Sequence, residues 1–325
     1  MDILPSERVS PSVPFENTGL DFMGPFGVKM NGRATHKVWA CVFTCFSSRA
    51  VHAEIVYKMD ADSLINAITR FSTRRPGTRR FFSDRGSNLT CADRVLKKEL
   101  EELNAASSRD CQRQGIQWDF IPAGTPHRGG VWERVIGLFK RHLALQSNGD
   151  PVHVDVFNTL VVEIEGIINR RPLTALSDNP KDFEPLTPSH ILYPGVYAHS
   201  SAILVPVPFG TGPENARTAW KQAQTRVNSF WSQWSQEYVT LLHSRKKWHK
   251  TRKNLENGDL VLIVDEQMKR CEWNLGRVIN ADSAKDHVRK AEILKVDGKT
   301  VTKDRTKLVL LELDEEVDKI PIGQH

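Results

Sequence analysis

The chain lacks the features of secreted and membrane-bound proteins. Its 325 residues include only five cysteines, irregularly spaced and never arranged as Cys-x-x-Cys. Such an odd set gives no disulfide framework, and Cys41 and Cys45 have no histidine pair nearby to complete a zinc site. Residues 1–16 carry no signal-peptide pattern, and no apolar run approaches membrane-spanning length. We therefore expect an intracellular protein with no membrane partner and no structural zinc.

Composition and charge are those of a globular protein with a basic surface. The hydrophobic fraction of 39% and the charged fraction of 26% are ordinary, and the length suffices for two domains. The net charge is +6 and the pI is about 9.0, which favours a polyanionic partner such as nucleic acid.

The first half of the chain alternates between strand-like and helical patterns of apolar residues. Three strands separated by short turns are predicted at 18–23, 37–46 and 50–57, the third half-buried with Val51, Ala53, Ile55 and Tyr57 on its apolar face. A helix at 61–74, capped by Asp60, then alternates with further elements: a strand at 79–83, a helix capped by Asn88 or Thr90 that runs to about 103, a strand at 116–121, and helices at 131–146 and 154–169. This order predicts an α/β domain, with a mixed five-stranded sheet flanked by helices on both faces.

The second half is predicted to hold a long amphipathic helix and a small β-barrel. The helix spans 214–243 and runs into a basic segment, and five short strands follow between 255 and 313. The predicted domains are an irregular lead-in at 1–17, a core at 18–200, a linker with the amphipathic and basic helix at 201–254, the barrel at 255–313 and a tail at 314–325.

Three acidic residues lie within distinctive short sequence motifs. Asp21 lies on the first predicted strand in Gly19-Leu20-Asp21-Phe22, Asp84 ends the fourth strand in Ser83-Asp84-Arg85-Gly86, and Glu133 begins a helix after a Gly-rich loop. Clustered carboxylates bind Mg²⁺ or Mn²⁺, and two such ions about 3.5–4 Å apart stabilise the attacking and leaving oxygens of phosphoryl transfer. We predict that Asp21 bridges two ions, while Asp84 and Glu133 each hold one.

More ordinary roles for the same residues stay open. An Asp after a strand is usually a turn or cap residue, and a Glu in the first turn of a helix usually serves the helix dipole. Nearby acidic residues compete with Glu133 by composition: Asp119, Glu163 and Glu165. What distinguishes Glu133 is its setting, since basic residues flank it or share its helix face: Arg134, Lys140 and Arg141. This setting fits a phosphate backbone near metal, and it also fits a plain solvated helix.

The ordered motifs resemble the integrases of long-terminal-repeat retrotransposons, most closely the BEL/Pao type, and more broadly the retroviral integrase superfamily. The main matching stretches are residues 14–26, Ser83-Asp84-Arg85-Gly86-Ser87-Asn88 and Pro126-His127-Arg128-Gly129-Gly130-Val131-Trp132-Glu133. Further matches lie at residues 169–173, 185–188, 231–248, 257–261 and 307–309. The resemblance covers nearly the whole chain.

The resemblance implies an RNase H-like fold and a catalytic, metal-binding triad of Asp21, Asp84 and Glu133. It implies Mg²⁺ or Mn²⁺, removal of nucleotides from the 3′ ends of element DNA, and attack of the new 3′-OH on target DNA, by a homo-oligomer acting in the nucleus. Lys140 would grip the element's end, and the C-terminal module would be an SH3-like barrel that binds DNA. Arg85 departs from the family, which often has Asn there.

Other DNA contacts are predicted from basic residues beyond the triad. These are His127 in the Gly-rich loop, Arg134 and Arg141 on the following helix, and Arg245, Lys246, Lys247, Lys250, Arg252 and Lys253 in the basic run. A second cluster around the fourth strand comprises Arg70, Arg74, Arg75, Arg79 and Arg80. A solvated surface is the alternative for both clusters. The stripe of Trp220, Trp231 and Trp234 is interpreted as packing rather than base stacking.

Two other functions are kept as alternatives to the transferase. One is a co-opted or decayed copy that binds DNA without catalysis, and the other is an RNase H-like nuclease. The family's N-terminal His-His-Cys-Cys zinc domain has no counterpart here. We therefore expect a fragment, a truncated gene model or one segment of a larger polyprotein, and we do not expect full concerted integration by this chain alone.

Overall fold

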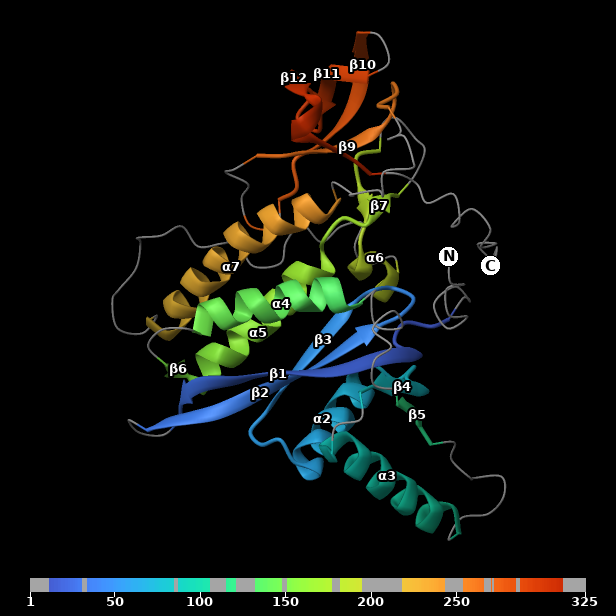
Figure 1. Cartoon of the computed structure of the whole chain (residues 1–325), viewed down its shortest axis with the longest axis vertical. Coiled ribbons are helices and arrows are strands. Elements are labelled where there is room, and N and C mark those ends of the chain that lie inside the picture. The colour runs from blue at the N-terminus through green and yellow to red at the C-terminus, as the bar shows by residue number, and fades with distance from the viewer. Residues whose placement is uncertain are drawn as a thin grey trace. The chain divides into compact units, whose positions relative to one another are not determined.

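The structure is a computed structural model (Figure 1) that describes residues 12–30, 34–84, 87–105, 115–120, 132–147, 151–176, 182–194, 218–242, 254–265, 270, 272–284 and 287–311. The chain divides into two compact units. The first comprises Met1–Asn169 with Val207–Phe230, and the second Arg170–Pro206 with Trp231–His325. Within the described residues, no helix combines the length and apolar character needed to cross a membrane.

A mixed sheet forms the centre of the first unit, in the order β3-β2-β1-β4-β5. The strands are β1 (Asn17–Lys29), β2 (Thr35–Cys45), β3 (Val51–Val56), β4 (Arg80–Ser83) and β5 (Gln117–Phe120). The first three pair antiparallel, whereas β4 is parallel to β1 and β5 is parallel to β4. The predicted mixed five-stranded sheet is thus confirmed. The two-residue β6 (Val152–His153), which was not predicted, pairs with the far end of β1.

Helices cover both faces of this sheet. They are α2 (Ala61–Arg74), α3 (Ser87–Ala105), α4 (Trp132–Ser147) and α5 (Val154–Asn169). Figure 1 shows α2 and α3 on one face and α4 and α5 on the other. Helix α2 begins as predicted, because the Asp60 carboxylate accepts the Ser63 N–H at 2.9 Å and so caps the first turn.

The packing under α2 decides which way the side chains of β1 point. Phe71 of α2 stacks on Phe43 of β2, with ring centroids 4.0 Å apart. Leu20 of β1 is in register with Phe43 and is buried, so Leu20 faces α2. Side chains alternate along a strand, and Asp21 therefore faces the α4 and α5 side.

The second unit contains an antiparallel sheet of five strands in the order β12-β11-β10-β9-β13. The strands are β9 (Leu260–Ile263), β10 (Leu275–Ala284), β11 (His287–Lys295), β12 (Thr300–Asp304) and β13 (Leu308–Leu310). The five predicted strands are present. The predicted closed barrel is not confirmed, because β12 and β13 lie at the two ends of the sheet and no pairing joins them among the described residues.

Both faces of this second sheet are covered around β9. Val261 and Ile263 belong to one core, whereas Leu260 and Leu262 belong to another that includes Ala175 and Val239. Ala175 lies on β7 (Thr174–Ala175), which pairs with β8 (Pro185–Leu186) ahead of the short helix α6 (Pro188–Leu192). All four residues of β9 are buried, as expected of a strand covered on both sides.

The tryptophan stripe lies on helix α7 (Thr218–Leu242). In the second unit Trp234 stacks on Tyr238 at 5.0 Å, and Trp231 packs edge-on against Trp273, also at 5.0 Å. Trp231 and Trp234 are buried, which confirms packing rather than base stacking for these two side chains.

Candidate functional site

Two of the three predicted carboxylates lie on adjacent parallel strands. Thr18 and Gly19 of β1 are in register with Phe81 and Phe82 of β4. Extending this register by two residues brings Asp21 beside Asp84, the first residue beyond β4. Residues in register on neighbouring strands share a face of the sheet, and the strands lie about 4.8 Å apart. The pairing itself ends at Gly19 and Phe82, so the proximity of Asp21 and Asp84 on the α4 face is a prediction from this register.

The carboxylate of Asp21 is already engaged on both oxygens. Its Oδ1 accepts the N–H of Phe22 at 2.7 Å, and its Oδ2 lies 2.5 Å from Nζ of Lys140 in α4. The Asp21 side chain is 39% exposed and that of Lys140 33%. Asp84 is exposed. Helix α4 is thus tied by an ion pair to the strand that carries the first carboxylate.

Glu133 is placed by its backbone alone. It lies in the first turn of α4, seven residues before Lys140. Two helical turns separate these positions, so they share a helix face and lie about 10 Å apart along the axis. The side chains of Glu133 and Arg134 lie outside the described residues. The convergence of the third carboxylate therefore stays a prediction.

The acidic residues that competed with Glu133 are engaged elsewhere. Asp119 of β5 forms an ion pair with Nε of Arg80 at 2.7 Å. Glu163 of α5 accepts a hydrogen bond from Gln224 at 2.5 Å, and Glu165 lies in a separate ionic network at β3. In these contacts, the three carboxylates bind partners other than Asp21.

The residues at the site fit a hard divalent cation. Asp21 and Asp84 offer carboxylate oxygens, the ligands that Mg²⁺ and Mn²⁺ prefer, and the ammonium of Lys140 already occupies one of them. Burial, together with the negative charges of Asp21 and Glu54, raises the pKa of the Cys41 thiol well above its usual range, so Cys41 offers no thiolate. Among the described side chains, no three His, Cys, Asp or Glu residues gather into a metal site, and Glu133 is not one of those side chains.

The five arginines around β4 all have carboxylate partners. Arg70 and Arg74 bind Glu54, Arg75 lies 3.6 Å from Glu165, and Arg79 lies 3.8 Å from Glu16. Arg80 binds Asp119, as described above. These contacts favour a structural role over the phosphate-binding interpretation of this cluster.

For the remaining residues that were predicted to contact DNA, the structure gives less detail. Arg141 is exposed on α4. The other predicted contacts lie outside the described residues: His127, Arg245, Lys246, Lys247, Lys250, Arg252 and Lys253.

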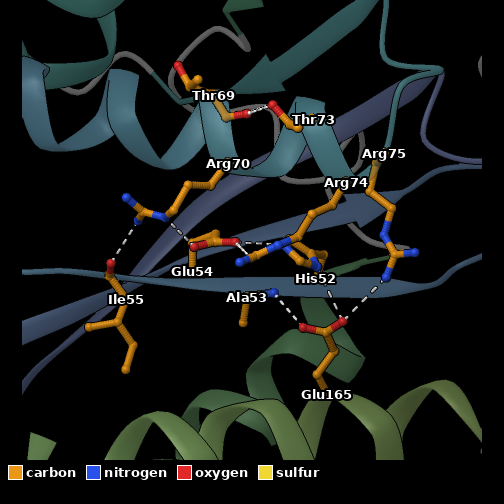
Figure 2. A network of polar contacts seen from close by, with 10 residues as sticks. All are labelled: His52, Ala53, Glu54, Ile55, Thr69, Arg70, Thr73, Arg74, Arg75 and Glu165. Carbon is orange, nitrogen blue, oxygen red and sulfur yellow. Dashed lines mark hydrogen bonds and ion pairs between the residues drawn. The ribbon is translucent and has the colours of Figure 1, made fainter. Parts of the chain in front are cut away.

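A network of charged side chains that the sequence did not predict surrounds the edge strand β3 (Figure 2). Glu54 of β3 contacts Arg70 and Arg74, which come from α2. Glu165 reaches the strand from α5, where it accepts the Ala53 N–H at 3.0 Å and contacts a ring nitrogen of His52 at 3.3 Å. The other ring nitrogen of His52 lies 3.0 Å from Glu54.

Side chains also satisfy the free edge of β3. Asn169 of α5 accepts the Val51 N–H at 2.8 Å and donates to the Val51 carbonyl at 2.7 Å. Arg70 donates to the Ile55 carbonyl at 3.0 Å. Together with Glu165 on the Ala53 N–H, these contacts occupy four of the backbone groups that a further strand would use.

The geometry assigns a protonated imidazole to His52. A neutral imidazole has one N–H, yet both ring nitrogens of His52 face carboxylate oxygens. Burial alone lowers its pKa, but hydrogen bonds to Glu165 and Glu54 outweigh burial and raise the pKa above the ordinary 6.5. For Glu54, burial raises the pKa, but hydrogen bonds from His52 and Arg70 bring it below the ordinary 4.5.

These shifts predict how the stability of the network depends on pH. The contribution of His52 is fully present below pH 6.5 and is lost as the pH rises through its raised folded pKa. The contribution of Glu54 is present above pH 4.5 and is lost as the pH falls through its lowered pKa. Hydrogen exchange of β3, corrected for intrinsic rates, should therefore show protection that falls as the pH rises above 6.5.

The His52→Gln variant isolates the histidine's part in this effect. It should lack the decline in protection above pH 6.5, because glutamine does not titrate. His153→Gln, at an exposed histidine, should retain it. Parallel wild-type and His52→Gln profiles across this range would contradict the assignment.

The sequence did not predict a role for two residues near Asp84. Ser83 and Trp118 of β5 are buried on the α2 face and hydrogen-bonded to each other. The alternation of Phe81, Phe82 and Ser83 was a usable signal, because it places Ser83 on the same buried face as Phe81.

Comparisons with known proteins give partial likenesses. Residues 218–311 match a family described as "Family of unknown function (DUF5641)", which is less than half of the chain. No curated protein matches the chain.

Similar solved structures include three from viral integrases. One is the cryo-EM structure of the simian T-cell lymphotropic virus intasome in complex with PP2A regulatory subunit B56 gamma, at 13% identity and TM-score 0.36, covering 97% of this chain and 85% of that one. The catalytic core domain of BIV integrase has 16% identity and TM-score 0.35, with coverage of 55% and 93%. The HTLV-2 integrase catalytic core domain in complex with magnesium has 16% identity and TM-score 0.35, with coverage of 56% and 98%. At these scores the likenesses establish no activity, and the fold rests on the strand order and register.

Proposed function

We propose that this chain is an integrase-type polynucleotidyl transferase, of the BEL/Pao retrotransposon type, that processes the 3′ ends of element DNA and joins them to target DNA. One observation supports the proposal above all: β1 pairs in parallel with β4, so Asp21 of β1 and Asp84 directly after β4 would meet on the sheet face that packs against α4. The first turn of that helix holds Glu133. The order of strands and helices around these residues supports the RNase H-like assignment.

The proposed chemistry follows from the charges at the site. Asp21, Asp84 and Glu133 would hold two Mg²⁺ or Mn²⁺ ions, which when bound stabilise the attacking and leaving oxygens of phosphodiester transfer. Lys140, once displaced from Asp21, would bind a phosphate of the DNA end. The antiparallel sheet of the second unit, an SH3-like module in this proposal, would bind DNA in a homo-oligomer that acts in the nucleus.

The test is a DNA-joining assay with the full chain. Duplexes ending in the terminal repeats that flank the locus are incubated with plasmid and Mg²⁺ or Mn²⁺. We expect shortened 3′ ends and plasmid joined to the duplex, both dependent on the metal. Hydrolysis of RNA·DNA hybrid without joined products would favour the nuclease. DNA binding without products, and indifferent to metal, would favour the non-catalytic DNA-binding protein.

The ion pair between Lys140 and Asp21 predicts a competition between the ammonium and the metal. Lys140→Met should tighten Mn²⁺ binding about fivefold, because it removes a cation from Asp21 Oδ2 that is worth about 1 kcal/mol at a partly exposed site. The same variant should bind DNA ends more weakly. Calorimetric titration with Mn²⁺ measures the first effect.

Arg141→Met is the matched control for this competition. It removes one positive charge from the neighbouring, exposed position of α4. Equal tightening of Mn²⁺ binding in both variants would attribute the effect to net charge and would contradict specific competition by Lys140.

A further inference from the structure

A buried hydrogen-bond relay ends at Asp84. The indole Nε1–H of Trp118 donates to Oγ of Ser83 at 2.8 Å, and the Ser83 hydroxyl donates to the main-chain carbonyl of Asp84 at 2.9 Å. Ser83 is 2% exposed and Trp118 is 7% exposed. Both members of the relay are thus held inside the protein, on the side of the sheet opposite to Asp84.

Aromatic side chains surround Ser83, so the presence of a buried hydroxyl at this position needs an explanation. Trp118 packs against Phe81 at 5.4 Å and stacks on Phe120 at 5.7 Å. Phe120 is in register with Ser83. A buried hydroxyl is costly among such groups unless its hydrogen-bonding capacity is used, and an alanine would fill the same space without that cost. Here the hydroxyl both accepts and donates, and the bond that it donates goes to Asp84.

Asp84 stands where the chain leaves the sheet. The pairing of β4 with β1 ends at Phe82, and its pairing with β5 ends at Ser83. The hydroxyl of Ser83 therefore holds the first peptide group beyond the sheet. The Asp84 carboxylate projects from this same stretch of main chain, so a shift of the Asp84 backbone would move the carboxylate relative to Asp21.

We propose that Ser83 and Trp118 are positioning residues that fix the backbone at Asp84, so that its carboxylate meets the cation shared with Asp21. The inference rests on the proposed function, in which Asp84 is a metal ligand. Ser83 and Trp118 act through Asp84 and do not touch metal or DNA themselves.

Mn²⁺ affinity of the full chain, measured by calorimetry or by electron paramagnetic resonance, tests the relay. Ser83→Ala and Trp118→Phe should each weaken Mn²⁺ binding about tenfold, because each breaks the relay while conserving shape. The double variant should be no weaker than either single one, since the two residues act as a unit. Ser83→Thr, which keeps a hydroxyl, should restore affinity to near that of the wild type.

Phe120→Leu separates positioning from packing. It disturbs the ring stacked on Trp118 and should lower the thermal midpoint, yet it should leave Mn²⁺ affinity unchanged. If Phe120→Leu weakens Mn²⁺ binding as much as Ser83→Ala does, the effect is one of packing and the inference is overturned.

The Asp84→Asn variant distinguishes failure of the relay from failure of the proposed metal site. If it abolishes Mn²⁺ binding while Ser83→Ala and Trp118→Phe bind like the wild type, the relay is overturned and the proposed function stands. If Mn²⁺ binding is indifferent to Asp84→Asn, both the relay and the proposed metal site are overturned.

Discussion

Asp84→Asn and Asp21→Asn should each lose metal-dependent DNA cutting and joining by about a thousandfold or more. Each substitution removes a negative charge from the proposed metal site. Metal ions supply several kcal/mol of transition-state stabilisation, and each 1.36 kcal/mol is worth a factor of ten in rate. The products are measured on gels with the DNA-joining assay described above.

The control for these two variants is Asp119→Asn. Asp119 lies on the neighbouring strand β5 and forms an ion pair with Arg80, so its replacement tests the loss of a carboxylate near the site without touching the proposed ligands. It should retain most of the activity. Full activity of a folded Asp84→Asn protein would refute the assignment of Asp84, and equal losses in all three variants would indicate a non-specific effect.

Glu54→Ala should lower the free energy of unfolding of the first unit by about 3 kcal/mol. Removing one partner of a buried ion pair costs about 3–5 kcal/mol, because the remaining charge is left uncompensated. The side chain of Glu54 is 7% exposed, whereas its partners Arg70 and Arg74 are 41% and 58% exposed. The arginines can regain water and His52 cannot, which places the expected cost at the lower end of that range. Denaturant unfolding monitored by hydrogen exchange of β3 measures it.

An exposed ion pair provides the comparison for Glu54. Lys97 and Asp93 of α3 lie 2.8 Å apart at i, i+4, and Lys97 is 56% exposed. Lys97→Ala should cost less than about 0.5 kcal/mol, since such surface pairs contribute little. A cost for Glu54→Ala as small as this would show that the network at β3 contributes no more than surface charges do.

The element pattern was largely readable from local sequence. The helices at 61–74 and 154–169 have the predicted bounds, and the central strands differ by a few residues at most, except for β1, which continues to Lys29. Apolar spacing and the Asp60 cap are local signals, so tertiary contacts were not needed to find these elements.

The half-buried character predicted for β3 was wrong. All six residues from Val51 to Val56 are buried, including His52 and Glu54. Their partners come from α2 and α5, which follow later in the chain, and no periodicity within the strand reveals such contacts. The alternation of apolar and polar residues correctly predicted a strand. It did not reveal that the polar face of this strand is also covered.

The candidate site was predictable in part for the same reason. The motifs singled out Asp21 and Asp84, and the parallel pairing of β1 with β4 supports the prediction that they lie near each other. The ion pair of Lys140 with Asp21 and the relay from Trp118 depend on packing between distant segments, so no local pattern in the sequence predicts them. Glu133 remains a prediction.

The occupied edge of β3 has a consequence for how copies of this chain meet one another. An open edge strand can pair with a strand from another molecule. Such pairing leads to aggregation as readily as to a defined complex. Here the carboxamide of Asn169, the carboxylate of Glu165 and the guanidinium of Arg70 would first have to be expelled. These side chains therefore protect this border of the sheet against the addition of a strand from another molecule.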